Sequence, residues 1–295
     1  MKVLVTGGAG FIGSHLVDLL VQRGDHVTVF DNMSSGRAEF IAHHGDSVRF
    51  FEGDLLDLDA VKTAMDGIEL VFHLAANPDI RLGTRVTDTD LKQGTIATYN
   101  VLEAMRCSDV KNIAFSSSSV VYGEAVEMPT PESYGPLFPI SLYGASKLAA
   151  DRIFVAANNL SGAGGTRFSV VRYGNVVGSR GSVVPFFNKL IAENSDHIPV
   201  THKDMTRFWI TLQQGVDFVL KNFERMLGGE IFVPKIPSIR ITDLATAMAP
   251  DIPIKYVGIR PGEKLHEMMC PGDMSLHTFE FDDHFVIAPA IKFFH

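Results

Sequence analysis

The sequence is notable for few cysteines, no surplus of positive charge and no long apolar run. Only Cys107 and Cys270 occur in 295 residues, which excludes a disulfide-rich secreted scaffold and favours two reduced thiols. The net charge of −8 argues against nucleic-acid or membrane-surface partners, because these attract concentrated Lys and Arg. No apolar run reaches the length of a membrane span, and Met1-Lys2 leads at once into a predicted strand. We therefore expect a soluble, cytoplasmic protein without a signal peptide.

A metal-ligand pattern is also missing from the sequence. The pair His43-His44 and the single His266 have no partners at the spacing that metal sites use. Solvated or hydrogen-bonded histidines are the simpler interpretation. The sequence therefore predicts no metal site.

Apolar segments of strand type alternate with helical patterns through the first two-thirds of the chain. The predicted strands cover residues 2–5, 26–30, 48–51, 70–74, 113–115 and 168–172, and helical patterns run over about 87–106 and 142–159. This alternation predicts an α/β fold, a Rossmann-type doubly wound parallel sheet covered by helices on both faces. Prolines punctuate shorter elements after about Gly178, so we expect a smaller C-terminal α/β lobe over residues 179–295. Residues 1–178 form the predicted dinucleotide-binding domain, with contributions from later segments.

The glycine-rich run Thr6 to Gly13 lies between the first predicted strand and an amphipathic segment. A strand, a glycine turn and the start of a helix form a pocket for a pyrophosphate. Gly7 allows the tight turn, Gly10 lets the backbone approach the phosphates, and Gly13 lets the helix pack close to the strand. The second predicted strand ends at Asp31, where an acidic residue accepts hydrogen bonds from ribose hydroxyls and repels a 2′-phosphate. This combination predicts NAD and disfavours NADP.

A tyrosine and a lysine, Tyr143 and Lys147, lie four residues apart on a predicted helix. At this spacing both side chains lie on one helix face, where the ammonium and an oxidised nicotinamide favour the phenolate. The pair then serves as a general base for a substrate hydroxyl. The serine run 116–119 ends a strand just upstream, and we expect Ser118 to donate to the same substrate oxygen.

Together these motifs resemble the extended short-chain dehydrogenase/reductase superfamily. Residues 1–147 most resemble UDP-glucose 4-epimerases, particularly in the sequence segments 75–81 and 98–104. The resemblance adds Asp54 and Leu55 beside the adenine, Ala75 and Ala76 along the cofactor, and Asn100 and Ser116 on either side of it. The expected cofactor contacts are Gly7, Gly10, Phe11, Ile12, Gly13, Asp31, Asn32, Asp54, Leu55, Leu74, Ala75, Ala76, Asn100, Ser116, Tyr143, Lys147 and Tyr173.

The second half, from about Asp151, is similar to inverting UDP-N-acetylglucosamine 4,6-dehydratases, closely so over 169–187, 205–211 and 258–267. We interpret the chain as a hybrid, either a natural recombinant or two joined halves. The resemblance implies a UDP-sugar substrate, with arginines on its diphosphate and Glu263 on a ribose hydroxyl. The expected substrate contacts are Asn175, Ser182, Val183, Val184, Arg207, Arg260 and Glu263.

The predicted reaction depends on the two residues that follow Ser118. Inverting dehydratases resemble this chain but carry an Asp-Lys pair where Ser119 and Val120 stand, and neither residue can supply that acid–base work. The sequence therefore predicts a UDP-sugar 4-epimerase that acts through a transient 4-keto sugar, with UDP-glucose and UDP-galactose or UDP-N-acetylglucosamine as its substrates. The alternatives are a 4,6-dehydratase with its acid and base supplied elsewhere, and a catalytically silent NAD- and UDP-sugar-binding protein. The resemblance also implies a homo-oligomer, with a dimer first and a dehydratase-like hexamer second.

Overall fold

The computed structural model describes residues 1–77, 82–122, 139, 141–161, 167–171, 174–179, 182–227, 229–259, 265–267, 269 and 277–288. Within these ranges the strands form three sheets, of which the largest has nine strands in the order β13-β14-β10-β6-β5-β4-β1-β2-β3. The strands of this sheet are β1 (Lys2–Thr6), β2 (His26–Asp31), β3 (Val48–Glu52), β4 (Leu70–His73), β5 (Asn112–Ser116), β6 (Arg167–Val171), β10 (Ile231–Pro234), β13 (Thr278–Glu280) and β14 (His284–Ile287).

Seven of the nine strands, from β3 across to β10, pair in parallel, and β14 and β13 add two antiparallel strands at one edge. The order β3-β2-β1-β4-β5-β6 reverses its direction of growth between β1 and β4. In a doubly wound sheet, a ligand binds beyond the carboxyl ends of the strands at such a reversal. The fold therefore places the candidate site beside the ends of β1 and β4, and the predicted Rossmann-type fold is confirmed.

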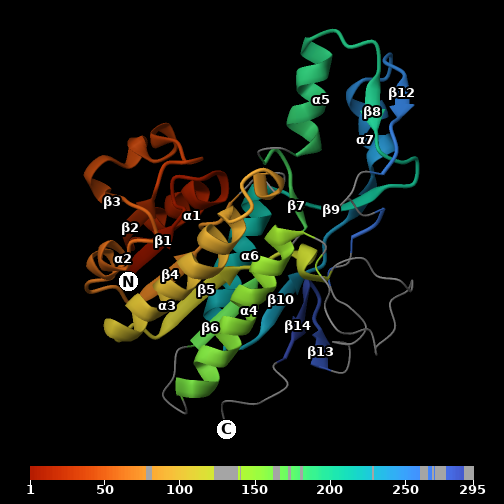
Figure 1. Cartoon of the computed structure of the whole chain (residues 1–295). Coiled ribbons are helices and arrows are strands. Elements are labelled where there is room, and N and C mark those ends of the chain that lie inside the picture. Colours follow the sequence, from red (N-terminus) through yellow and green to blue (C-terminus); the bar gives the residue numbers. More distant parts are fainter. Residues whose placement is uncertain are drawn as a thin grey trace.

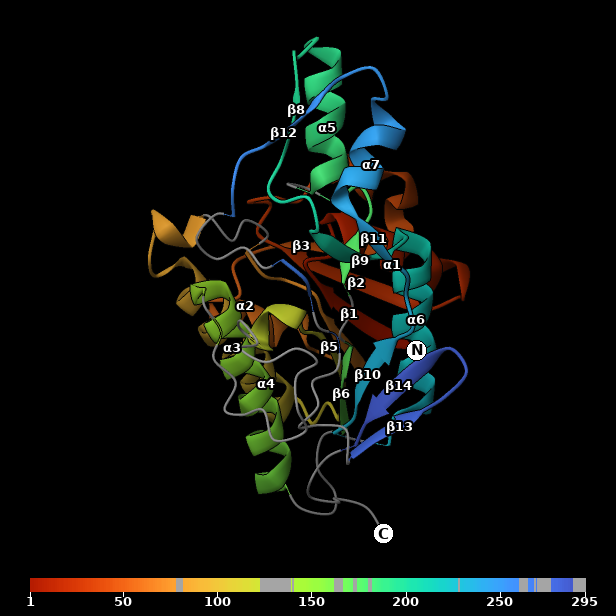
Figure 2. The ribbon, with the colours of Figure 1, turned by 90° about the vertical axis from the view of Figure 1, so that its right-hand side faces the viewer.

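Helices cover both faces of this sheet (Figure 2), which explains why its central strands are apolar throughout. One face packs against α1 (Phe11–Gln22) and α6 (Leu212–Arg225), the other against α2 (Leu58–Ala64), α3 (Ala97–Cys107) and α4 (Leu142–Ser161). Short helical turns complete this part: η1 (Ala38–Phe40), η2 (Ala42–Ser47), η3 (Leu82–Thr84), the π-helical η4 (Leu91–Ile96) and η5 (Ser119–Tyr122).

A smaller lobe extends away from the main sheet (Figure 1). It has its own apolar core, in which Phe187 of one helix packs with Ile198 and Ile241. Its elements are α5 (Val183–Ala192), β8 (Ile198–Val200), α7 (Ile241–Met248) and β12 (Ile254–Tyr256), and the sheet β11-β9-β7 joins it to the main layer through β7 (Asn175–Val176), β9 (Thr206–Ile210) and β11 (Ser238–Arg240).

The later segments divide between the two parts. Although α6, β10, β13 and β14 follow residue 178, they pack on or pair within the main sheet. The division into residues 1–178, with contributions from later segments, and residues 179–295 stays a prediction. The helical pattern predicted over 87–106 contains a π-helical turn, η4, before α3 begins.

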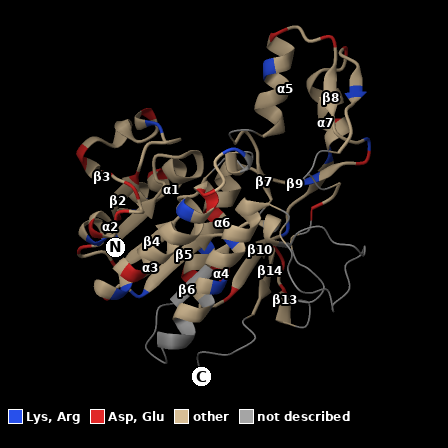
Figure 3. Cartoon of the chain, viewed as in Figure 1, with Lys and Arg blue, Asp and Glu red and all other residues tan. Residues whose placement is uncertain are grey.

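Lys and Arg residues alternate with Asp and Glu residues along the ribbon, on helices and on loops (Figure 3). Pairs such as Lys92–Asp88 and Arg106–Glu103 approach to 2.6 and 2.7 Å, although exposed pairs of this kind contribute little to stability. Nowhere in the described ranges is there a helix with the length and apolar character needed to cross a membrane.

Candidate functional site

The loop after β1 turns so tightly that it accepts only glycine at critical positions. Gly7 has φ +72°, and a Cβ there would lie 2.8 Å from the backbone nitrogen of Ala75. A Cβ on Gly13 would lie only 2.1 Å from the carbonyl oxygen of Gly7, so α1 packs directly on the loop. Gly10 donates its N–H to the Gly7 carbonyl at 3.1 Å and precedes the helix. These glycines bring the carboxyl end of β1 and the start of α1 together, as the sequence predicts.

The start of α1 can accept an anion. Gly10 occupies the N-cap position without a side-chain cap, and no acidic residue lies in the first turn. The first N–H groups of a helix have no partner within the helix, and their dipoles favour negative charge. Phe11 and Ile12, the first two residues of α1, are half-buried against the core beneath.

Asp31 ties the glycine loop to the end of β2. Its two carboxylate oxygens accept hydrogen bonds from the backbone nitrogens of Ala9, at 3.0 Å, and Met33, at 2.9 Å. Burial raises the pKa of this carboxyl, with the two backbone donors acting in the opposite direction. Carboxylate oxygens have further lone pairs, so these two bonds leave Asp31 able to accept from a ribose hydroxyl.

A second group of polar side chains surrounds Asp54, which follows β3 at the same end of the sheet as Asp31. The Gln93 amide donates to both Asp54 oxygens at 3.2 and 3.3 Å, and the Asn32 amide donates to one of them at 3.5 Å. Asn100 donates to the Leu55 carbonyl at 2.8 Å and so holds the backbone of this segment. The predicted residues of this group therefore lie together. Gln93 was missed, because a single amide in a helical pattern gives no sequence signal.

His73, also missed, links the ends of the two central strands. Its ring is fully buried between the hydroxyls of Thr6, 2.7 Å from Nδ1, and Thr98, 3.0 Å from Nε2. Burial and the nearby charge of Lys147 lower its pKa to about 3, so the ring is neutral at physiological pH. The sequence signal was its position at the end of an apolar strand.

The residues after His73 leave β4 and pass the glycine loop. Leu74 donates its N–H to the Thr6 carbonyl at 3.1 Å, and Ala75 donates to the Thr6 hydroxyl at 3.4 Å. Ala75 and Ala76 are half-buried where the chain passes Gly7. The structure thus brings Leu74 and Ala75 to the glycine loop, with Ala76 next along the chain, and their contact with a cofactor stays a prediction.

Tyr143 and Lys147 lie on the first two turns of α4, and the Lys147 side chain is buried. The Lys147 ammonium donates to the carbonyl of Ser116, the last residue of β5, at 2.9 Å. It also lies 4.7 Å from the Phe115 ring centre and 5.9 Å from that of Tyr143. Burial lowers the Lys147 pKa to about 8, against the effect of Asp151.

A glycine places this helix against the turn that follows β5. A Cβ on Gly144 would lie 3.0 Å from the carbonyl oxygen of Val120 in η5, so the start of α4 contacts that turn directly. The Ser118 carbonyl begins the turn by accepting from the Val121 N–H at 3.4 Å. The serine, the tyrosine and the lysine thus come from adjacent segments, at the carboxyl end of β5.

Behind Lys147 lies a buried carboxyl that no sequence pattern singled out. Asp151 accepts from the Ser117 hydroxyl at 2.9 Å, and burial raises its pKa to about 7, with Ser117 and Lys147 acting in the opposite direction. One turn separates it from Lys147 on α4. The helix thus presents an ammonium and a carboxyl of shifted pKa to the end of the central sheet.

This carboxyl makes a testable contribution to stability. At pH 5 the unfolded carboxyl is mostly ionised while folded Asp151 keeps its proton, so the folded state binds more protons and stability falls as pH rises toward 7. Relative to Asp151→Asn, the free energy of unfolding of the wild type should fall by up to about 3 kcal/mol between pH 5 and 8. Urea unfolding at pH 5 and at pH 8 measures this difference in the free energy of unfolding. The same comparison with Asp66→Asn, an exposed site, should give little change, and an equally small change with Asp151→Asn would contradict the burial argument.

The predicted substrate residues that the structure describes lie where the small lobe joins the sheet. Asn175 begins β7 and Ser182 precedes α5, and in each a buried side-chain oxygen finds no hydrogen-bond partner in the described chain. Buried polar atoms are normally bonded, so these two fit a ligand that would satisfy them. Val183 and Val184 form the first turn of α5.

Arg207 of β9 is held within the protein on one side. Its guanidinium donates to the carbonyl of Thr206 at 2.7 Å and lies 3.5 Å from a carboxylate oxygen of Glu267. A planar guanidinium with five donors keeps capacity for a phosphate beyond these contacts. Tyr173, Arg260 and Glu263 lie outside the described residues.

Comparison with known proteins places these features in context. A family model described as polysaccharide biosynthesis protein matches residues 3–289. The UDP-N-acetylglucosamine 4,6-dehydratase (inverting) of Campylobacter jejuni is 42% identical, over 99% of this chain and 84% of its own. A solved UDP-galactose 4-epimerase is 35% identical with TM-score 0.77, covering 92% of this chain and 90% of that one. The UDP-glucose 4-epimerase of Thermus thermophilus, solved with NAD, is 27% identical with TM-score 0.77, covering 92% and 91%.

These relatives are nucleotide-sugar epimerases and dehydratases, and each match covers at least 92% of the chain. The hybrid origin inferred from two separate resemblances stays a prediction, since the dehydratase match includes the first half as well as the second. The family model spans nearly the whole length. The chain therefore belongs to the polysaccharide biosynthesis protein family, within the extended short-chain dehydrogenase/reductase superfamily.

Proposed function

We propose that this protein is an NAD-dependent UDP-sugar 4-epimerase. The observation that carries the proposal is the residue composition of the segment from the end of β5 through η5, next to Tyr143 and Lys147. From Ser116 to Tyr122 it offers hydroxyl groups and valines, with no carboxyl, amine or imidazole side chain. Oxidation and reduction at a sugar carbon need one tyrosine–lysine pair, whereas elimination of water needs an additional acid and base.

The residues at the glycine loop and at the end of β2 fit NAD. The glycine loop leaves no room for a Cβ, the uncapped start of α1 suits a pyrophosphate, and the carboxylate of Asp31 suits ribose hydroxyls. The Thermus thermophilus relative was solved with NAD. When bound, NAD supplies reversible hydride transfer at the sugar.

The chain's own groups would handle the proton. Tyr143 takes the proton of the sugar hydroxyl, and Ser118 donates a hydrogen bond to the same oxygen. Lys147, held by the Ser116 carbonyl at 2.9 Å, keeps a positive charge near the phenol at pH values below its pKa of about 8. Returning the proton to the same oxygen after the sugar has turned completes an epimerisation without any further titratable group.

The substrate side of the proposal rests on the small lobe. Arg207 would bind the diphosphate, and the unsatisfied oxygens of Asn175 and Ser182 would bind the sugar or phosphate. The named relatives act on UDP-sugars by their names, which favours the same class here. A dimer through helices near η4, α3 and α4 belongs to the same proposal.

A second candidate function is UDP-N-acetylglucosamine 4,6-dehydratase. The observation in its favour is the 42% identity to the Campylobacter jejuni enzyme of that name. It requires an acid and a base from outside the segment 116–122. Because the first steps at C4 are shared, the same Tyr143 and Lys147 would serve both reactions.

One experiment separates these candidates. The purified full chain is incubated with NAD and either UDP-galactose or UDP-N-acetylglucosamine, and nucleotide sugars are resolved by chromatography with mass detection. Epimerisation gives a second sugar of unchanged mass. A product lighter by one water would sink the epimerase proposal and establish the dehydratase, and unchanged substrate with bound NAD would indicate a silent binding protein.

A further inference from the structure

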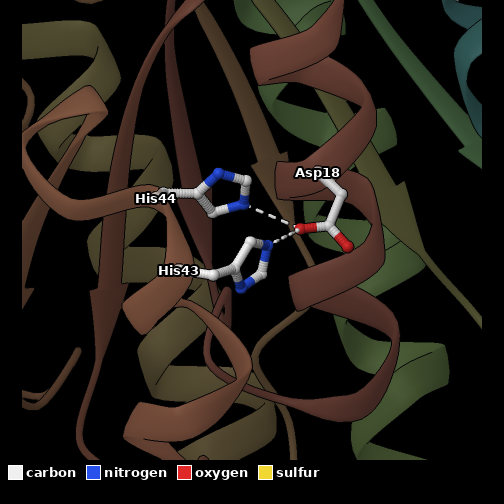
Figure 4. A group of neighbouring side chains, drawn as sticks. All are labelled: Asp18, His43 and His44. Carbon is white, nitrogen blue, oxygen red and sulfur yellow. Dashed lines mark hydrogen bonds and ion pairs between the residues drawn. The ribbon is translucent and has the colours of Figure 1, made fainter.

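A compact group of three metal-binding side chains lies on the outer surface of α1, apart from the residues of the proposed reaction. Asp18 of α1 meets His43 and His44 of η2, although about 25 residues separate them along the chain (Figure 4). The Nε2 atoms of both rings point to the same carboxylate oxygen, Oδ1 of Asp18, at 2.9 and 2.7 Å. All three potential ligand atoms lie within 4.8 Å of one another.

We propose that Asp18, His43 and His44 form a binding site for a divalent transition-metal ion, with Zn²⁺ as the preferred occupant. Two imidazoles and one carboxylate are a donor set that suits Zn²⁺, and a water molecule would complete a tetrahedron. Ca²⁺ and Mg²⁺ are disfavoured, because they take oxygen ligands.

The distances allow an ion to enter with small movements. Ligand atoms about 2.1 Å from Zn²⁺ at tetrahedral angles lie about 3.4 Å apart. The two nitrogen–oxygen distances, 2.9 and 2.7 Å, would have to widen by roughly 0.5–0.7 Å. The His43 side chain is 57% exposed and can shift by this amount. The Asp18 carboxylate, 29% exposed, can move away from His44, whose side chain is only 10% exposed.

The local chain conformation accounts for the convergence of the two rings. The His44 N–H donates to the Ile41 carbonyl at 3.1 Å within a helical turn, and Gly45 then reverses the chain with φ +51°. Ile41 is buried in the same core cluster as Leu16 and Val17 of α1. The turn is therefore anchored on α1 by apolar packing, and the ring centres lie 4.0 Å apart.

An ion here would fix the segment that follows β2 to α1. Within this segment, Arg37 donates its N–H to the Ala9 carbonyl in the glycine loop at 2.9 Å. The segment thus contacts the loop at one end and the middle of α1 at the other. A metal that binds only the folded segment stabilises the folded segment. Zn²⁺ should therefore make local unfolding of residues 38–47 rarer.

The test measures metal binding and does not depend on enzyme activity. The full chain, free of any histidine tag and stripped with a chelator, is titrated with Zn²⁺ in competition with a chromophoric chelator, and with Co²⁺ by visible absorption. We expect one ion per chain and a tetrahedral Co²⁺ spectrum. His43→Ala, His44→Ala and Asp18→Asn should each weaken Zn²⁺ binding at least about tenfold, because each removes one of three protein ligands.

A matched control exists in the small lobe. His197 and Asp196 form a comparable pair at 2.6 Å, but among the described residues they belong to no group of three potential ligands. His197→Ala should therefore leave the Zn²⁺ affinity unchanged. Hydrogen exchange over residues 38–47 should slow about tenfold with saturating Zn²⁺ in the wild type and remain unchanged in the double variant His43→Ala/His44→Ala. Equal Zn²⁺ affinity in the wild type and this folded double variant would overturn the proposal, as would loss of the single ion in His197→Ala.

Discussion

Replacing Tyr143 by Phe is expected to lower turnover by about 10²–10⁴-fold, the range that a positioned general acid–base contributes. The change removes one hydroxyl and leaves the ring, so packing around the start of α4 is preserved. Gly144, pressed against the Val120 carbonyl, continues to hold the helix on the turn after β5. The loss should therefore fall on kcat, with KM and NAD affinity nearly unchanged.

The measurement compares steady-state kinetics with calorimetric titration of NAD and UDP-sugar. Tyr256→Phe is the matched control, since the same hydroxyl is removed from a tyrosine that is 55% exposed on β12. That control should turn over at the wild-type rate. Equal rates in Tyr143→Phe and the wild type would show that the phenol takes no part in proton transfer.

Local patterns in the sequence predict the main sheet because its central strands are buried on both faces. Strands covered in this way are continuous apolar runs, and such runs predicted β1 to β6 within a residue or two at each end. The glycine loop and the Tyr143–Lys147 pair were predictable for a similar reason, because their chemistry depends on spacing along the chain. The i,i+4 spacing places both side chains on one face of α4.

Contacts between distant segments were not predictable in this way. Gln93 reaches Asp54 across 39 residues, and Asp18 meets His44 across 26, with no local pattern that marks either pair. The pairing of β10, β14 and β13 with the main sheet was not predictable either. These strands are short, and in the sequence they look like the strands of the small lobe. Spacing also did not reveal that the Lys147 ammonium is bonded to the Ser116 carbonyl, because this contact depends on how α4 lies on β5.

Replacing Gly13 by Ala is expected to damage both the fold and cofactor binding. The new Cβ would lie 2.1 Å from the Gly7 carbonyl oxygen and 2.8 Å from Gly8 Cα, both backbone atoms. The loop cannot recede, because Gly7 donates to the Phe30 carbonyl at 2.8 Å and already lies against Ala75. Relief therefore requires α1 to move away from the sheet, at a cost of about 3 kcal/mol in the free energy of unfolding.

Displacing α1 also carries away the N–H groups that would bind a pyrophosphate. Loss of two hydrogen bonds to a charged group, each about 1.5 kcal/mol, corresponds to roughly a 100-fold weaker NAD affinity. Denaturant unfolding gives the first quantity and calorimetric titration gives the second. The two losses should appear together, because one movement of the helix causes both.

Gly215→Ala is the matched control for this variant. Gly215 lies inside α6, where a Cβ would come no closer than 4.0 Å to the Ile210 side chain. Alanine is favoured over glycine in a helix by about 1 kcal/mol, so this variant should be as stable as the wild type or more stable, with unchanged NAD affinity. If Gly13→Ala behaved like Gly215→Ala, the close approach of α1 to the glycine loop would not be what shapes the site. A loss confined to Gly13→Ala would instead tie cofactor binding to that single helix–loop contact.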